Sequence, residues 1–392
     1  MALNASHYKG RPQALVKHTF LNEYLPALVN KICTHWTTFE YIDGFAGPWQ
    51  AADEAQFSDT SFGIALQAMS DAKKFQAARG RIVKMVAHLV EQEHDAFVKL
   101  PGLADQFPDI EVRPYEGDFH HHFPSIMDDL IPSAFCFSFV DPKGVSLDLG
   151  LLKPLLSRPS SEVLVNFMFD FVNRFASHPN ASVVETMNKL IPGTDWRPLL
   201  DLAKAQGAPP NEREQILLDG FRKGLSIVGD YDFVTSLMVQ KPLADRTYYH
   251  LVFGTRSSSG LSVFRDSQIK ALETQAGVRS TEKSKAKTAK TGQDDLFGGS
   301  DAIPIDPSSK EIEDGRSQGI LYAKEIIDKS PEGVLWGVLW PQVLTEFTIK
   351  QSELAKAINN MRRNGEIEAP NWPSPKHRKP NDKQLFRPTK NP

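Results

Sequence analysis

The sequence contains few cysteines: two in 392 residues, Cys33 and Cys136, which lie far apart and inside apolar segments. This count excludes a disulfide scaffold, and it excludes a cysteine-ligated zinc or iron–sulfur site built by this chain alone. The sequence also lacks an apolar run of 18 residues and the N-terminal apolar segment of a signal peptide. We therefore expect a cytoplasmic protein without a membrane partner.

A strong excess of charge of either sign is also missing. The formal net charge is −3, so the whole chain is not an electrostatic nucleic-acid binder, although a local basic patch can still act as one. Apolar residues make up 41% and charged residues 24%, which is ordinary for a soluble globular protein. At 392 residues the chain is long for a single core, so two domains are expected.

The N-terminal part is organised around residues 39–49, an apolar strand that ends in Asp43. The small residues Gly44, Ala46 and Gly47 follow, and they allow a sharp bend and a close approach of a ligand to the backbone. In an open parallel sheet, nucleotide-like ligands bind at this end of the first strand. The stretch lacks both a lysine and the spacing G-x-G-x-x-G that a phosphate would need. We therefore favour S-adenosylmethionine (SAM), whose amino group Asp43 can hold; the alternative is a turn that binds nothing.

Two further apolar segments end in residues that suit the rest of such a ligand. Residues 82–90 precede Glu91, at the position where a Rossmann-like site holds ribose hydroxyls; a surface carboxylate is the alternative. Residues 110–115 precede Asp118 and Phe119, which can hydrogen-bond and stack on adenine. The histidines at 120–122 are interpreted as a first helical turn without a metal.

The segment 134–140 is the most strand-like part of the chain and runs into Asp141 and Pro142. Proline ends the strand there, which places a carboxylate at the crevice of the sheet and makes these two residues the candidate catalytic pair. Lys17 and His18, on a helix predicted over 15–36, are interpreted as solvent-facing. The alternative is that they contact the ligand.

The later segments complete the predicted domain. A strand over 161–169 carries Asn166, and Asp170 and Arg174 begin a helix in which they can form an i,i+4 pair or contact substrate. Residues 175–230 are predicted to form a helical insertion that shapes a substrate groove. Strands over 233–240 and 246–254 form a late hairpin, and a helix over 263–275 follows. The domain is expected to span 1–277. Residues 278–315 are rich in Lys, Ser and Gly and are expected to form a flexible linker.

Residues 316–392 are predicted to form a winged helix-turn-helix domain, with three helices and a two-stranded wing. They contain 13 Lys and Arg against 8 Asp and Glu, so they carry +5 while the rest of the chain carries −8. The third helix, over 350–364, would enter a nucleic-acid groove while the wing contacts phosphates. A protein-interaction module is the alternative. The candidate contacts to DNA or RNA are Lys350, Lys356, Arg362, Arg363, Lys376, Arg378 and Lys379.

The stretches 41–48, 117–119, 139–144 and 166–167 together resemble the three-Cys-motif partner family, over about residues 15–275. The resemblance implies a class I methyltransferase fold, an α/β Rossmann-like sheet with a late hairpin, and a partner protein that carries a three-cysteine motif and resembles radical-SAM enzymes. It also implies SAM as ligand, with Asp43, Gly44, Ala46 and Gly47 near the methionine half, Glu91 at the ribose, and Asp118 with Phe119 at the adenine.

Residues 141–144 read Asp-Pro-Lys-Gly and depart from the Asp/Asn-Pro-Pro-Tyr motif of amino-methyltransferases. Without the second proline and the aromatic residue, N-methylation of a flipped base is in doubt. Transfer to another atom and ligand binding without turnover both remain open. The leading hypothesis is a methyltransferase-like enzyme acting on nucleic acid. The alternative is a non-catalytic adaptor that docks the partner and finds DNA, and its crevice at Asp141 could be filled by its own side chains.

Overall fold

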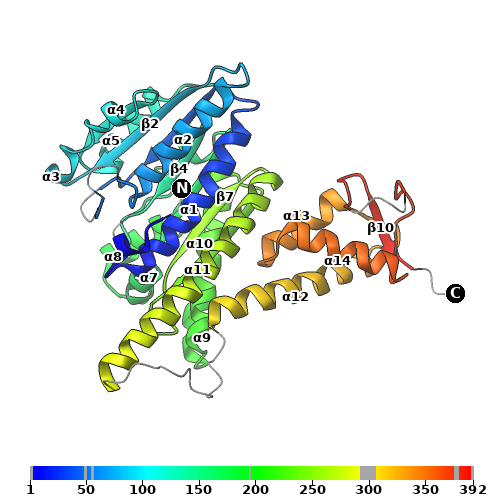
Figure 1. The fold of residues 1–392 in the computed structure, drawn as a ribbon. Helices are drawn as coiled ribbons and strands as arrows, with labels where there is room; N and C mark the ends of the chain where they lie inside the picture. Colours follow the sequence, from blue (N-terminus) through cyan, green and yellow to red (C-terminus); the bar gives the residue numbers. More distant parts are fainter. Residues whose placement is uncertain are drawn as a thin grey trace. The chain divides into compact units, whose positions relative to one another are not determined.

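The computed structural model describes residues 3–47, 51–53, 57–142, 144–193, 196–291, 306–374 and 379–389. The chain divides into two compact units, Met1–Ser257 and Ser258–Pro392, called here the N-terminal and C-terminal units (Figure 1). Among the helices within these ranges, none is long and apolar enough to cross a membrane.

The N-terminal unit is built on a seven-stranded sheet in the order β3-β2-β1-β4-β5-β7-β6. The first five strands are mutually parallel, and β7 runs antiparallel to both β5 and β6. This mixed α/β arrangement with a late hairpin fits a Rossmann-like methyltransferase fold, which confirms that part of the prediction. The strands are β1 (Thr38–Asp43), β2 (Lys84–Glu91), β3 (Glu111–Glu116), β4 (Phe135–Val140), β5 (Ser161–Phe167), β6 (Phe233–Gln240) and β7 (Thr247–Thr255).

Helices cover both faces of this sheet, which explains why β1, β4 and β5 are buried at every position. One face packs against α1, where the Tyr24 ring lies 5.3–5.7 Å from those of Phe137 and Phe253, and against α2 beside it (Figure 1). The helices are η1 (Ala5–Tyr8), α1 (Pro12–Ile32), α2 (Ser61–Ala77), α3 (His94–Phe97), α4 (Leu103–Gln106), α5 (Phe119–Asp129), α6 (Lys153–Leu156), α7 (Phe169–Phe175), α8 (Ala181–Leu190), α9 (Trp196–Ala205) and α10 (Pro210–Gly229).

Residues 175–230 are helical, as predicted, and they pack into the core of the domain instead of standing apart from it as a cap. Apolar side chains of α8, α9 and α10 are buried in one cluster with β4 and β5, and the rings of Phe167 and Phe221 stack at 4.5 Å. Burying these side chains on the sheet removes more apolar surface from water than a solvated cap would. The segment therefore forms a layer of the domain.

The predicted boundaries at 277 and 315 are wrong within the described residues. Helix α11 (Ser258–Thr291) runs past 277, and α12 (Pro307–Asp328) begins before 316; residues 292–305 lie outside the described ranges. The run 278–291 is polar, but its Ala, Lys and Glu are strong helix formers, and Lys285 pairs with Glu282 at 2.8 Å. Polar composition was therefore a poor reason to expect a coil.

The C-terminal unit combines α11 and α12 with α13 (Trp336–Glu346), α14 (Gln351–Arg363) and a three-stranded sheet. The sheet order is β8-β10-β9, from β8 (Val334–Leu335), β9 (Ile367–Glu368) and β10 (Leu385–Pro388). Arg265 of α11 is buried and donates to the carbonyls of Leu344 at 2.6 Å and Thr345 at 2.9 Å, near the end of α13. A cation there complements the helix dipole and joins α11 to α13.

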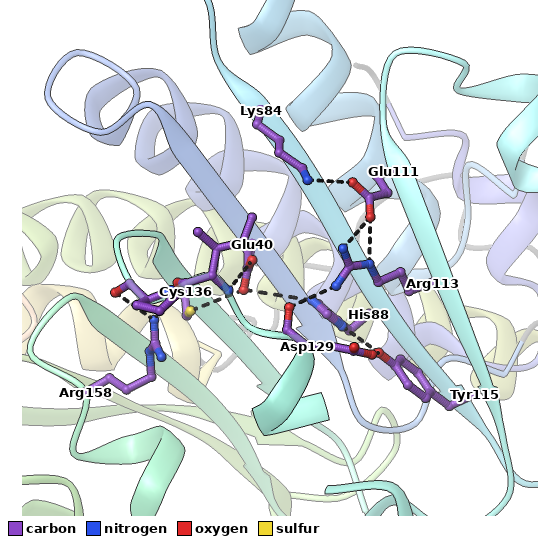
Figure 2. A network of polar contacts seen from close by, with 11 residues as sticks. Glu40, Lys84, His88, Glu111, Arg113, Tyr115, Asp129, Cys136 and Arg158 are labelled. Atoms are coloured by element: carbon purple, nitrogen blue, oxygen red, sulfur yellow. Dashed lines mark hydrogen bonds and ion pairs between the residues drawn. The ribbon is translucent and has the colours of Figure 1, made fainter. Parts of the chain in front are cut away.

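A polar network runs from the buried Glu40 of β1 and His88 of β2 to the surface at Asp129 of α5 (Figure 2). Glu40 and His88 have fully buried side chains, with Glu40 Oε2 3.8 Å from His88 Nε2, and Glu40 Oε1 accepts from the Ile131 backbone N–H at 3.0 Å. His88 Nδ1 lies 2.9 Å from the Tyr115 hydroxyl, which donates to Asp129 at 2.7 Å. Burial raises the pKa of Glu40 and lowers that of His88 to about 4, so His88 is neutral at pH 7.

We expect lowering the pH from 7 to 4 to cost the wild type about 3 kcal/mol of unfolding free energy relative to a His88→Gln variant. The unfolded chain protonates His88 near pH 6.5, whereas burial holds the folded pKa at about 4. The folded state therefore loses stability as the pH falls through this window. Urea unfolding at both pH values measures the difference, with the exposed His35 changed to Gln as control. Parallel profiles for wild type and His88→Gln would contradict the prediction.

Candidate functional site

The chain reverses direction across the sheet between β1 and β4, which are neighbours although they are far apart in sequence. In open α/β sheets, ligands bind outside the carboxyl ends of the strands at such a switch point. Asp43 is the last residue of β1, and Asp141 follows the last residue of β4. The structure thus brings the predicted cofactor-binding and catalytic carboxylates to the same edge, which is called here the switch-point edge.

Asp43 is completely buried and accepts three hydrogen bonds from its own surroundings. Oδ1 accepts from the Phe45 backbone N–H at 3.1 Å, and Oδ2 accepts from the hydroxyls of Tyr41 at 2.9 Å and Ser61 at 2.8 Å. Burial raises the pKa of Asp43 to about 6, although these hydrogen bonds act in the opposite direction. Asp43 therefore fixes the turn after β1 and the start of α2, and a carboxylate with three acceptor sites in use has room for one further donor.

The small residues after Asp43 hold a tight turn against the neighbouring strands. The Gly44 N–H donates to the Phe139 carbonyl of β4 at 3.1 Å, and the Ala46 N–H donates to the Val90 carbonyl of β2 at 2.8 Å. A side-chain carbon on Gly44 would lie 3.0 Å from the Phe119 ring, a tight contact that would push the ring away slightly. Gly47 donates its N–H to the Phe45 carbonyl at 3.0 Å. The turn after β1 is thus hydrogen-bonded to the ends of both neighbouring strands, β2 and β4.

Glu91, Asp118 and Phe119 lie at the ends of β2 and β3, but each has a structural contact of its own. Glu91 is 5% exposed, and its Oε1 accepts from the Glu93 backbone N–H at 2.6 Å. Asp118 caps α5 by accepting from the N–H groups of His120 and His121 at 2.8 and 3.3 Å. Phe119 is 1% exposed and packs against Phe45 and Phe123, so it lies in the core instead of offering an open ring for stacking.

Asp141 is held on both carboxylate oxygens by side chains from other elements. Lys17 of α1 donates to Oδ2 at 2.5 Å, and Asn166 at the end of β5 donates to Oδ1 at 2.5 Å. The register pairs Val140 with Val165, which places the next residues, Asp141 and Asn166, side by side. The Asp141 side chain is 20% exposed, and Pro142 beside it is buried. The carboxylate therefore retains a solvent-facing part at the switch-point edge.

The predicted solvent exposure of Lys17 and His18 is wrong. The Lys17 side chain is 16% exposed and bound to Asp141, whereas His18 is 4% exposed with Nδ1 3.0 Å from the Tyr8 hydroxyl. Helical periodicity did not identify these partners, because Lys17 and Asp141 are 124 positions apart. Asp59 was missed for the same reason: it is 1% exposed, pairs with Arg11, and accepts from the Ala52 N–H at 2.9 Å.

A pocket of about 450 Å³ lies elsewhere in this unit, between α1, α2 and α4. Its lining includes Asn22, Ile64, Gln67 and Phe107, and it contains none of the predicted site residues. The candidate residues at the switch-point edge therefore do not line this cavity. We place the candidate site by the geometry of the strand ends.

The predicted nucleic-acid contacts of the C-terminal unit fall into three groups. Lys356, Arg363 and Lys379 are exposed, and Lys350 is half-buried at the start of α14. Arg362 lies over the Trp372 ring at 4.3 Å and donates to Asn359 at 3.0 and 3.2 Å, so it packs within the unit. Lys376 and Arg378 lie outside the described residues.

No protein-family model matches the chain, and no curated protein matches it. Among solved structures it is similar to loganic acid methyltransferase with SAH, at 7% identity and a TM-score of 0.27, over 74% of this chain and 93% of that chain. A TM-score this low supports no argument about ligand or activity. The comparisons do not support the resemblance to the three-Cys-motif partner family, which stays a prediction.

Proposed function

We propose that this chain is a SAM-dependent methyltransferase-like protein that acts on nucleic acid. The observation that carries the proposal is the convergence of Asp43 and Asp141 at the switch point of a mostly parallel sheet with a late hairpin. Coulombic repulsion from Asp141 adds to the raised pKa of Asp43, whose main cause is burial, so the two carboxyls lie close enough to interact. Paired acidic groups at this edge favour a ligand with ammonium and hydroxyl donors.

The chemistry of the donor set fits SAM better than a phosphorylated cofactor. Among the described residues, no lysine or arginine forms an ion pair with Asp43 or Asp118, whereas phosphate oxygens would require such cations or a nest of N–H groups. Asn166 adds a buried Oδ1 that has no hydrogen-bond partner in the described part of the chain. Unsatisfied buried acceptors are rare, and a donor on a ligand would satisfy this one.

SAM would supply an activated methyl group, so the residues of this chain mainly bind and orient. Asp43, Gly44, Ala46 and Gly47 would hold the methionine half, Glu91 the ribose, and Asp118 the adenine. Asp141, oriented by Lys17 and Asn166, would hold the acceptor group and take up its proton. Phe119 contributes by packing the turn, because its ring is buried.

The nucleic-acid part of the proposal rests on the C-terminal unit. Its helices α12, α13 and α14 and a small antiparallel sheet suit a winged helix-turn-helix, and exposed Ser352, Lys356, Asn360 and Arg363 recur on α14 at helical spacing. DNA is the expected ligand. A three-Cys-motif protein as partner is proposed on the sequence resemblance alone.

A non-catalytic adaptor is the second candidate, and one observation favours it. Both oxygens of Asp141 are occupied by Lys17 and Asn166 of the same chain, as expected of a crevice filled by its own side chains. The two candidates differ in one measurable property. The enzyme transfers a labelled methyl group from SAM to DNA or RNA, whereas the adaptor transfers none while still binding DNA.

Calorimetric titration of SAM into the full chain tests the cofactor assignment. We expect micromolar binding by wild type and at least a tenfold loss in Asp43→Asn, because the substitution removes the charge that holds the ammonium. The matched control is Glu162→Gln. Glu162 is a buried carboxylate that also accepts from a tyrosine and a second hydroxyl, Tyr24 at 2.6 Å and Thr255 at 2.7 Å, but it lies near the start of β5.

The control separates loss of binding from loss of stability. Both substitutions remove a buried carboxylate, and Glu162→Gln should leave SAM affinity within twofold of wild type. Equal losses in the two variants would show that folding, not the switch-point edge, governs binding. Absence of binding by a folded wild type would overturn the cofactor assignment, and the adaptor would then lead.

A further inference from the structure

Three cations surround one carboxylate beside the switch-point edge. Asp170, in the first turn of α7, has a side chain that is 7% exposed. Its Oδ2 accepts from Arg174 at 2.6 Å, and its Oδ1 accepts from Lys241 at 3.0 Å and Arg246 at 3.5 Å. The predicted i,i+4 pair between Asp170 and Arg174 is therefore confirmed, and two further cations share the same carboxylate. Burial alone would raise the pKa of Asp170, but these hydrogen bonds lower it below its ordinary value.

This cluster presents more donors than one carboxylate can accept. The side chains of Arg174 and Arg246 are 62% and 66% exposed, and each guanidinium carries five N–H donors. Among the described residues, one nitrogen of each guanidinium contacts Asp170, which leaves the others facing solvent. Asp245, in the same hairpin turn, is exposed and offsets one positive charge, so the cluster retains an excess of one. A buried anchor with outward guanidiniums is suited to an anion with several oxygens.

Two aromatic rings stand among these cations. The Arg174 guanidinium lies 5.3 Å from the Phe171 ring centre, and the Lys241 ammonium lies 5.8 Å from the Tyr248 ring centre. Both rings are half-buried, so part of each remains accessible. Cations interleaved with partly open rings are typical of surfaces that bind single-stranded nucleic acid, where bases stack and phosphates pair.

The cluster adjoins the candidate catalytic carboxylate. Helix α7 begins two residues after β5, whose Asn166 binds Asp141. The register pairs Phe167 with His250, which places the β6–β7 turn, with Lys241 and Arg246, at the same edge. The Phe171 ring also lies 4.0 Å from where a side-chain carbon on Gly144 would stand, in the loop after Asp141. A base stacked on the Phe171 ring would therefore lie next to the loop that follows Asp141.

We propose that Phe171, Arg174, Lys241, Arg246 and Tyr248, anchored by Asp170, form a subsite that binds one nucleotide of a single-stranded nucleic acid. Its phosphate pairs with the guanidiniums and its base stacks on Phe171. The subsite deepens the proposed function, on which it rests for its role, by naming the substrate as an unpaired strand. It also places a nucleic-acid contact in the N-terminal unit, where the net charge gives no sign of one.

Fluorescence anisotropy with a labelled twelve-nucleotide single strand tests the subsite. All proteins are full-length and carry Lys356→Ala and Arg363→Ala, so that exposed residues of α14 do not mask the result. We expect Phe171→Leu to weaken binding at least fivefold through lost stacking. Arg174→Gln should lower the slope of log affinity against log salt by about 0.7, as loss of one phosphate contact requires.

A matched control lies at the C-terminal end of α2, where Arg79, two residues beyond the helix, stands 3.5 Å over the ring of the exposed Phe75. Phe75→Leu and Arg79→Gln remove the same groups and should change neither affinity nor slope. Equal effects at the two places, wild-type affinity in Phe171→Leu, or no saturable binding by the parent protein would each overturn the subsite. If free adenosine monophosphate competes as strongly as the unlabelled oligonucleotide, the assignment of a single strand as ligand is wrong and the subsite binds a free nucleotide. The SAM titration of wild type judges the proposed function separately.

Discussion

Replacing Asp141 with alanine is expected to lower methyl transfer to nucleic acid by about 100-fold to 10,000-fold, the range for losing a positioned acid or base. The carboxylate is the one candidate group at the end of β4 that is both oriented on two sides and still 20% exposed. SAM binding should stay within a few-fold of wild type, because Asp43 and Glu91 are untouched. Transfer of a radiolabelled methyl group to DNA and RNA pools measures the effect.

Two companion variants show how Asp141 acts. Asp141→Asn keeps the shape and loses the charge, so it should be as inactive as Asp141→Ala if the group takes up a proton. Lys17→Met removes the cation on Oδ2 and should lower activity less than Asp141→Ala does if Lys17 only orients the carboxylate. If the wild type binds SAM but transfers no methyl group to either pool, the methyltransferase proposal is wrong and the non-catalytic adaptor is favoured. Full activity in Asp141→Ala would place the chemistry elsewhere.

Replacing Arg256 with methionine is expected to cost the N-terminal unit about 3–5 kcal/mol of stability. Its guanidinium donates to the carbonyls of Leu156 and Arg158, each at 2.8 Å, and to that of Gly229. It also lies 4.6 Å from the centre of the buried Tyr231 ring. Hydrogen bonds to a charged group contribute about 1.5–3 kcal/mol each, and the substitution leaves these carbonyls without their donor.

Hydrogen exchange followed by mass spectrometry on β5 and β7 peptides reports this unit separately from the C-terminal unit. Arg256→Lys should recover only part of the loss, because a single ammonium cannot donate to all three carbonyls that the two terminal nitrogens of the guanidinium reach. Arg79→Met, at an exposed position, should change stability by roughly 0.5 kcal/mol or less. Protection factors in Arg256→Met equal to those of wild type would contradict the role.

The strands of the first unit were predictable because their signal is local. Every residue of β4 except Ser138 is apolar, a pattern typical of a strand covered on both faces. The same locality explains the errors. The polar composition of 278–291 predicts a linker, whereas its high helix propensity favours the helix that forms. The amphipathic helices of 175–230 do not show in their sequence which surface they cover, so their packing on the sheet cannot be predicted from it.

The candidate site was predictable only in part. Asp43 and Glu91 end their strands and Asp141 directly follows β4, as expected, because alternating strands and helices place successive carboxyl ends at one edge. Their roles as ligand contacts stay predictions. The capping of α5 by Asp118 follows a local rule, but the burial of Phe119 depends on Phe45 and Phe123 packing around it.

By itself, the sequence determined the order of strands and helices and the residue type at the end of each strand, because both depend on neighbours along the chain. Only the tertiary structure decided which side chains meet there. Lys17 reaches Asp141 across 124 positions, and Arg246 reaches Asp170 across 76. Such pairs form because α1 packs on β4 and because the sheet order sets β5 beside β7. No local periodicity encodes that order, since it is selected by burial of the whole sheet.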